Sequence, residues 1–238
     1  MSTIIREIAP GLVTFSRPFR RFGAPIGGRS TAIRLSSGDV FLIASTQLDQ
    51  ATKETIESLG KVKYIIAIDA EHTIFVESYQ NAYPEAKLIG VETLDKRKPH
   101  LRWDHLYTSN NPPPFSQLPP DISTQFFPSF INKDLAILHK PSRTLLVADL
   151  LWNLPAGEQN GLPTDYENWF HSLMSPGTRF QRAFLWLASI KDGKAMSRDA
   201  KVVDGWDFNR IIPCHGDVIE TGGKEAWRST YTGFLKGT

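Results

Sequence analysis

Side chains that can bind a metal or move a proton gather where three apolar segments of the sequence end. These segments cover residues 64–68, 144–148 and 210–212. The candidates that follow them are Asp69, Glu71, His72, Asp149 and His215. Carboxylates and imidazoles are ligands of divalent cations and act as general acids and bases, so we expect metal or proton-transfer chemistry at this place.

Each candidate also has a purely structural explanation. Asp149 could cap a helix that starts at Leu150, and His215 with Gly216 could form a turn that bonds to the backbone. A polar group that directly follows an apolar strand needs a partner, because burial without one is costly. Loops at the ends of core strands assemble sites in open α/β folds, and the set as a whole therefore favours a site.

The elements that must position these residues alternate along the chain. Short apolar or β-branched runs predict strands at 12–15, 30–35, 40–43, 64–68, 87–90, 125–127, 134–139, 144–148 and 210–212. Capping residues and apolar spacing predict helices at 49–59, 77–83, 180–190 and 225–235. A hairpin run followed by β-α-β-α-β order predicts an α/β fold with a mixed sheet. We interpret the proline-rich segment 110–120 as a loop inside a single domain, 1–238.

Composition narrows the class of protein. Lys and Arg number 27 against 25 Asp and Glu, a net charge of +2, and no long basic run occurs, so we expect no nucleic-acid partner. No stretch of eighteen apolar residues occurs, so we expect no membrane span. Residues 1–7 lack a secretory apolar core, and the single cysteine, Cys214, fits a reducing compartment as a small buried thiol, so the expected location is cytoplasmic.

The motifs resemble the metallo-β-lactamase superfamily over most of the chain. The matching landmarks are the opening strands, the approach to the 64–68 strand, AYPEAK at 82–87, TLLVAD at 144–149 and PCHGD at 213–217. The segment KPSRT at 140–144 looks like an uncharacterised subgroup known by a domain-of-unknown-function label. The resemblance implies an αββα sandwich of two mixed β-sheets flanked by helices.

The family's His-x-His-x-Asp-His loop falls on AIDAEH at 67–72. Ala67 and Asp69 then replace both leading histidines, Glu71 replaces the aspartate, and His72 is unchanged. No Gly-His pair occurs at 126–132, where the family places another ligand, so the resemblance implies that the first metal site is dismantled. The second metal site would keep Glu71, His72, Asp149 and His215.

This ligand set predicts one divalent metal ion. Zinc is the first expectation, and because two carboxylates make the set harder, manganese or iron(II) could compete. A cation there would support hydrolysis of a small ester, lactone, thioester or amide, with Asp69 or Glu71 as the catalytic base. Glu71 is one methylene longer than Asp, so it could act as a base behind the ligands instead of as a ligand.

Two other functions stay open at the level of sequence. The same pocket could serve an isomerase or lyase, with or without metal, or the site could have decayed to leave a non-catalytic binding protein. Trp152, Tyr166, Trp169 and Phe170 could line an apolar cavity for a small-molecule substrate. Oligomeric state is not indicated by the sequence.

Overall fold

Strands from the first half of the chain form the larger of two sheets. The computed structural model describes residues 2–21, 23–109, 118–161, 173–189 and 191–236. In these residues the larger sheet has the order β1-β2-β5-β6-β7-β8-β9. Its strands are β1 (Ile4–Ala9), β2 (Leu12–Arg17), β5 (Gly28–Arg34), β6 (Val40–Ile43), β7 (Val62–Ile66), β8 (Lys87–Val91) and β9 (His105–Tyr107). Strands β1, β2, β5 and β6 pair antiparallel, and β7, β8 and β9 continue in parallel.

The second half of the chain contributes the smaller sheet, with the order β10-β11-β12-β13. Its strands are β10 (Ile122–Phe127), β11 (Asp134–His139), β12 (Thr144–Val147) and β13 (Arg210–Pro213). The first three pair antiparallel, and β13 returns parallel to β12. A short hairpin of β3 (Arg20–Arg21) and β4 (Ala24–Pro25) lies apart from both sheets.

The two sheets pack face to face because their apolar residues alternate. On β11, Leu135 and Ile137 join the core shared with the larger sheet, whereas Ala136 and Leu138 join the core under the C-terminal helices. Successive side chains of a strand point to opposite faces, so one strand serves both layers.

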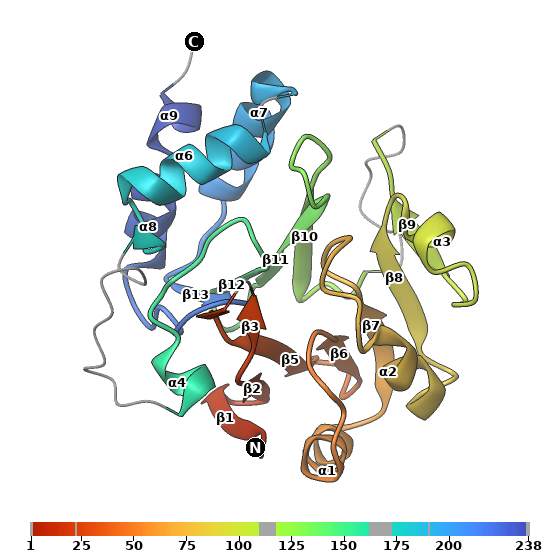
Figure 1. Ribbon diagram of the computed structural model, residues 1–238. Coiled ribbons are helices and arrows are strands. Elements are labelled where there is room, and N and C mark those ends of the chain that lie inside the picture. The colour runs from red at the N-terminus through yellow and green to blue at the C-terminus, as the bar shows by residue number, and fades with distance from the viewer. Residues whose placement is uncertain (1, 22, 110–117, 162–172, 190, 237–238) are drawn as a thin grey trace.

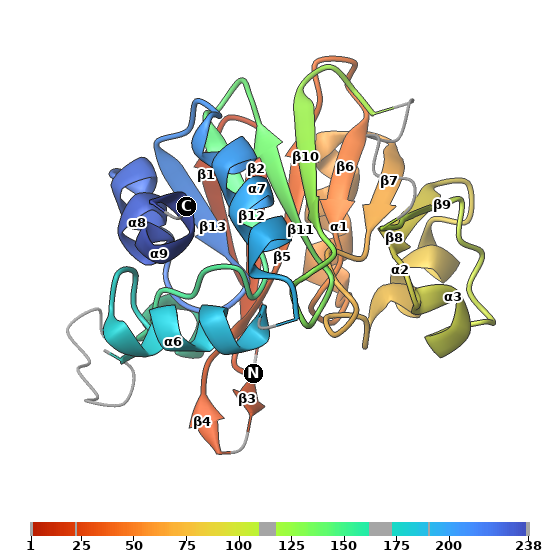
Figure 2. The same cartoon turned by 90° about the horizontal axis from the view of Figure 1, so that it is seen from above.

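Helices cover the outer faces of both sheets (Figure 1). The larger sheet carries α1 (Gln50–Leu59), α2 (Val76–Ala82) and α3 (Leu94–Arg97). The smaller sheet carries α6 (Arg179–Ala188), α7 (Gly193–Asp204), α8 (Gly223–Thr230) and α9 (Thr232–Leu235). The turned view in Figure 2 shows the sheets between these two groups of helices. The short α4 (Gly157–Asn160) packs beside β2. The predicted sandwich of two mixed sheets is confirmed.

Several elements differ from the sequence prediction. Strand β1 was not predicted because it is an edge strand with mixed polarity, and α7 was not predicted at all. The predicted helix 225–235 is two helices, separated at the buried Tyr231, whose ring stacks on Trp227 at 3.9 Å and whose hydroxyl donates to the Leu150 carbonyl. Helix α1 is capped by Asp49, whose side chain accepts from the Thr52 backbone N–H. Of the proline-rich segment, residues 110–117 lie outside the described residues.

Candidate functional site

Three strand-end loops bring His72, Asp149 and His215 together. Nε2 of His72 lies 3.0 Å from Nε2 of His215. Oδ1 of Asp149 lies 3.6 Å from Nε2 of His215 and 4.0 Å from Nε2 of His72. These loops follow β7, β12 and β13, and the three side chains therefore meet beyond the carboxyl ends of strands in both sheets, where the sequence placed them.

Asp69 holds the His72 ring from behind. Its Oδ2 accepts from Nδ1 of His72 at 2.7 Å, while its Oδ1 accepts from the backbone N–H groups of Glu71 and His72. Burial acts to raise the pKa of Asp69, but the charge of His72 and these hydrogen bonds hold it below its ordinary value. Burial opposes protonation of His72, but Asp69, Cys214 and Asp149 together raise the pKa of His72 well above its ordinary value. The ring is thus fixed with Nε2 directed at His215.

His215 is fixed in the same sense by the backbone. Its Nδ1 donates to the Gly27 carbonyl at 2.7 Å, so Nε2 is again the nitrogen that faces the cluster. The rings of Trp152 and Phe19 flank the imidazole, with distances of 4.7 and 6.3 Å between their ring centroids and that of His215. Burial and the positive charge of His72 lower the pKa of His215 to about 3. His215 is therefore neutral at physiological pH.

A buried arginine holds the loop that carries His215. Nη1 of Arg29 donates to the carbonyls of Pro213 and Gly216, both at 2.7 Å, which lie on either side of Cys214 and His215. Its Nη2 pairs with Glu158 at 3.3 Å. Arg29 is 2% exposed, so its hydrogen bonds lie in a low-dielectric interior where they strongly fix the loop.

Asp149 is oriented by neighbours on three sides. Its Oδ1 accepts from Nε1 of Trp152 at 2.9 Å, and its Oδ2 accepts from Nδ2 of Asn132 at 2.5 Å. Its backbone N–H donates to Oδ2 of Asp134. Burial raises the pKa of Asp149, although the charge of His72 opposes the shift. Asp134 is buried beneath it, and burial together with the charges of Asp69 and Asp149 raises the pKa of Asp134 well above its ordinary value.

Cys214 is a further donor that the sequence treated as a filler of the core. Donor atoms of His72, Cys214 and His215 lie within 4.8 Å of one another, and the same holds for Asp69, His72 and Asp149. The thiol donates to the Arg29 carbonyl at 3.8 Å. Its position next to His215 is the sequence signal that could have marked it.

The cluster fits a divalent cation. Both Nδ1 atoms donate to oxygen, so the two facing Nε2 atoms are both acceptors unless a proton or a cation lies between them. Two nitrogens bound tetrahedrally at about 2.0–2.1 Å are about 3.3 Å apart, close to the 3.0 Å seen here. Asp149 supplies the nearby negative charge. We conclude that His72, Asp149 and His215 could hold such an ion.

Glu71 and Asp69, the other two predicted site residues, lie beside the three facing side chains and are bound to neighbours. Glu71 Oε1 pairs with Nη1 of Arg97 at 3.0 Å, and Glu71 belongs to neither donor group of the described residues. Asp69 is 0% exposed behind His72 and is absent from the described lining of the pocket. Glu71 as ligand and either residue as catalytic base stay predictions.

Of the four predicted pocket aromatics, Trp152 lies against His215 and Asp149. Tyr166, Trp169 and Phe170 lie outside the described residues.

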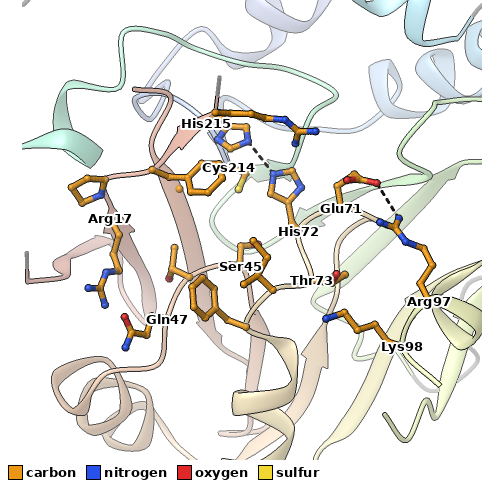
Figure 3. A pocket seen from close by; sticks show the side chains of 17 residues that line it. Arg17, Ser45, Gln47, Glu71, His72, Thr73, Arg97, Lys98, Cys214 and His215 are labelled. Atoms are coloured by element: carbon orange, nitrogen blue, oxygen red, sulfur yellow. Dashed lines mark hydrogen bonds and ion pairs between the residues drawn. The ribbon is translucent and has the colours of Figure 1, made fainter. Parts of the chain in front are cut away.

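A cavity of about 590 Å³ opens in front of the imidazoles. Figure 3 shows His72, Cys214 and His215 on one wall and Glu71, Arg97 and Lys98 to the side. Its volume is that of a small-molecule site. Charged side chains in the described lining are Arg17, Arg21, Glu71, Arg97 and Lys98.

Solved structures similar to this chain share one architecture. A metallo-β-lactamase from Pontibacter korlensis superimposes with a TM-score of 0.63 at 10% identity, over 99% of this chain and 100% of that one. A metallo-β-lactamase from Pseudomonas aeruginosa in a mono-zinc form gives a TM-score of 0.58 at 10% identity, over 99% and 96%.

The chain adopts the metallo-β-lactamase fold. The same fold is matched in a flavo-di-iron protein from Thermotoga maritima, with a TM-score of 0.68 at 9% identity over 98% of this chain and 62% of that one. Identities near 10% show a likeness of fold alone, and the fold implied by the sequence motifs is confirmed.

No family model and no curated protein sequence matches the chain. Membership of the uncharacterised subgroup therefore stays a prediction. Among the described residues, no helix of this metallo-β-lactamase fold has the length and apolarity needed to cross a membrane.

Proposed function

We propose that this protein is a mononuclear metal-dependent hydrolase of a small ester, lactone, thioester or amide. The observation that carries the proposal is the pair of Nε2 atoms 3.0 Å apart, each on a ring whose Nδ1 is held by an oxygen, with Asp149 beside them. The mono-zinc form of one structurally similar metallo-β-lactamase supports a single ion.

His72, Asp149 and His215 are the residues that would hold the ion. When bound, a divalent cation supplies Lewis-acid polarisation of a substrate carbonyl and activation of water. Asp69 keeps His72 in the tautomer that presents Nε2, and the Gly27 carbonyl does the same for His215. Trp152 and Asn132 hold Asp149 in place.

Proton transfer falls to a carboxylate that reaches the cavity. In the described lining that carboxylate is Glu71, whose Oε1 is held by Arg97. Glu71 is therefore the group that takes the proton of the attacking water in this proposal.

Zinc is the ion we propose, because the thiol of Cys214 lies with the two imidazoles and softens the donor set. Manganese and iron(II) remain the alternatives that the carboxylates allow.

Metal content tests the proposal directly. The protein purified without chelator is expected to hold about one equivalent of metal by elemental analysis, and His215→Ala and Asp149→Asn are expected to lose it. His100→Ala is the matched control, because His100 pairs with Glu77 at the surface. The rate of hydrolysis of small esters, lactones, thioesters and amides should decrease in the variants that lose the metal. A protein that takes up no zinc, manganese or iron(II) after incubation contradicts the proposal.

A further inference from the structure

The open side of the cavity carries donors that have no acceptor in the described residues. Arg97 uses Nη1 for the Ala70 carbonyl at 2.5 Å and for Glu71 at 3.0 Å, and its Nε and Nη2 make no hydrogen bond there. Within the same residues the ammonium of Lys98 has neither a hydrogen bond nor an ion pair. Two adjacent residues thus present unused N–H groups to one cavity.

Glu71 helps to orient the guanidinium of Arg97. Its carboxylate and the Ala70 carbonyl both accept from Nη1 of Arg97, so they anchor one edge of the guanidinium and leave the other free. In Figure 3 the ammonium end of Lys98 lies below Thr73, among the side chains that line the pocket. The anchored guanidinium is preorganised for a planar acceptor, because its remaining donors form a fork.

The charge of the lining is unlike that of the whole chain. Lys and Arg barely outnumber Asp and Glu in the sequence, 27 against 25, yet the described lining holds Arg21, Arg97 and Lys98, together with Arg17 that pairs with Asp49, against Glu71. A cavity with an excess of one sign of charge concentrates ligands of the opposite sign.

One neutral donor in the same lining also lacks a partner among the described residues. The hydroxyl of Ser45 is buried and makes no hydrogen bond to any of them. A buried polar atom without a partner is costly, which is the pattern expected where a polar ligand completes the site.

We propose that Arg97 and Lys98 form a subsite for a carboxylate or phosphate group, and that the natural ligand of the cavity is a small anion. The statement that this ligand is hydrolysed rests on the proposed function. The anion subsite itself rests only on the donors, their charge and the cavity.

Isothermal titration of the full chain tests the subsite without turnover. The probes are succinate, inorganic phosphate and the neutral succinamide, with the protein as purified and after dialysis against a chelator. We expect at least one anion to bind about tenfold more tightly than succinamide in both preparations, and the stronger of the two identifies the favoured group. Raising the salt concentration should weaken that binding.

Variants locate the binding. Arg97→Ala and Lys98→Ala are each expected to weaken the anion about five- to tenfold. Lys96→Ala is the matched control, because it removes an exposed cation of the same helix that does not line the cavity. Equal affinity for succinamide and the anions, no binding of any probe, an unchanged Arg97→Ala/Lys98→Ala double variant, or an equal loss in Lys96→Ala would each overturn the subsite.

The two proposals fail separately. Hydrolysis of neutral and anionic esters with the same KM overturns the subsite and leaves the hydrolase. Anion binding by a chain that takes up no metal overturns the hydrolase and leaves the subsite.

Discussion

The two walls of the cavity differ in how firmly their polar side chains are held by neighbouring residues. On the buried wall, His72, Asp149 and His215 are each held by a neighbour, through Asp69, Asn132 with Trp152, and the Gly27 carbonyl. On the open wall, Arg97 is held along one edge and Lys98 is not held by any described residue. Fixed donor atoms suit a metal ion, which needs its ligands at set distances and angles. Long cationic side chains can adjust to the shape of a polyatomic anion.

Of the changes predicted here, Asp69→Asn should have the largest effect, and this effect is on zinc binding at the buried wall. It keeps the shape behind His72 but removes the negative charge that makes the imidazole basic, so zinc affinity should fall about 10- to 100-fold. Competition with a chromophoric chelator measures the loss. Asp95→Asn, at an exposed position of α3, is the control. An unchanged affinity would mean that Asp69 does not act through His72 on a metal.

The pH dependence of metal binding separates the two imidazoles. Because the pKa of His72 is raised well above its ordinary value, the metal-free protein carries a proton on His72 at pH 7, and zinc must displace it. Zinc affinity should therefore rise about tenfold per pH unit up to the pKa of His72 and level off above it.

His215 should add nothing to this slope at neutral pH, since its pKa is about 3 and it is already neutral there. Calorimetry in buffers of different ionisation enthalpy counts the protons, and about one should be released per zinc at pH 7 while the Cys214 thiol keeps its hydrogen bond to the Arg29 carbonyl. Release of none would contradict the charge assigned to His72.

Glu71→Gln gives the smallest effect expected on binding, as distinct from hydrolysis, and tests on which wall this residue acts. If Glu71 only anchors Arg97, zinc affinity stays within about twofold and anion affinity falls by about two- to threefold, as for a partly exposed ion pair. Titration of one protein sample with zinc and with the favoured anion measures both values. A tenfold loss of zinc would instead make Glu71 a metal ligand, as the sequence predicted.

The sequence could predict the positions of the site because they follow strands. His72, Asp149 and His215 each lie shortly after a strand that the apolar pattern identified, and the ends of β12 and β13 are brought side by side by parallel pairing. The sheet framework thus fixes which loops meet.

The direction of a side chain within a turn could not be predicted from that pattern. Asp69 accepts the backbone N–H groups two and three residues ahead, and this Asx turn sends Glu71 outward to Arg97 while His72 points inward. Arg97 lies 26 residues further on, and no local pattern links the two. The roles of Cys214 and Arg29 depend likewise on contacts across the sandwich.

Arg29 also ties formation of the site to folding of the whole chain. It leaves β5 of the larger sheet and donates to carbonyls at the end of β13 in the smaller one, 184 and 187 residues away. Removing the guanidinium of Arg29 from water is costly unless both carbonyls and Glu158 are in place to replace its hydrogen bonds to water. Neither half of the sequence therefore forms the metal site without the other. A fragment carrying His72 alone or His215 alone should bind metal only as an unstructured peptide does.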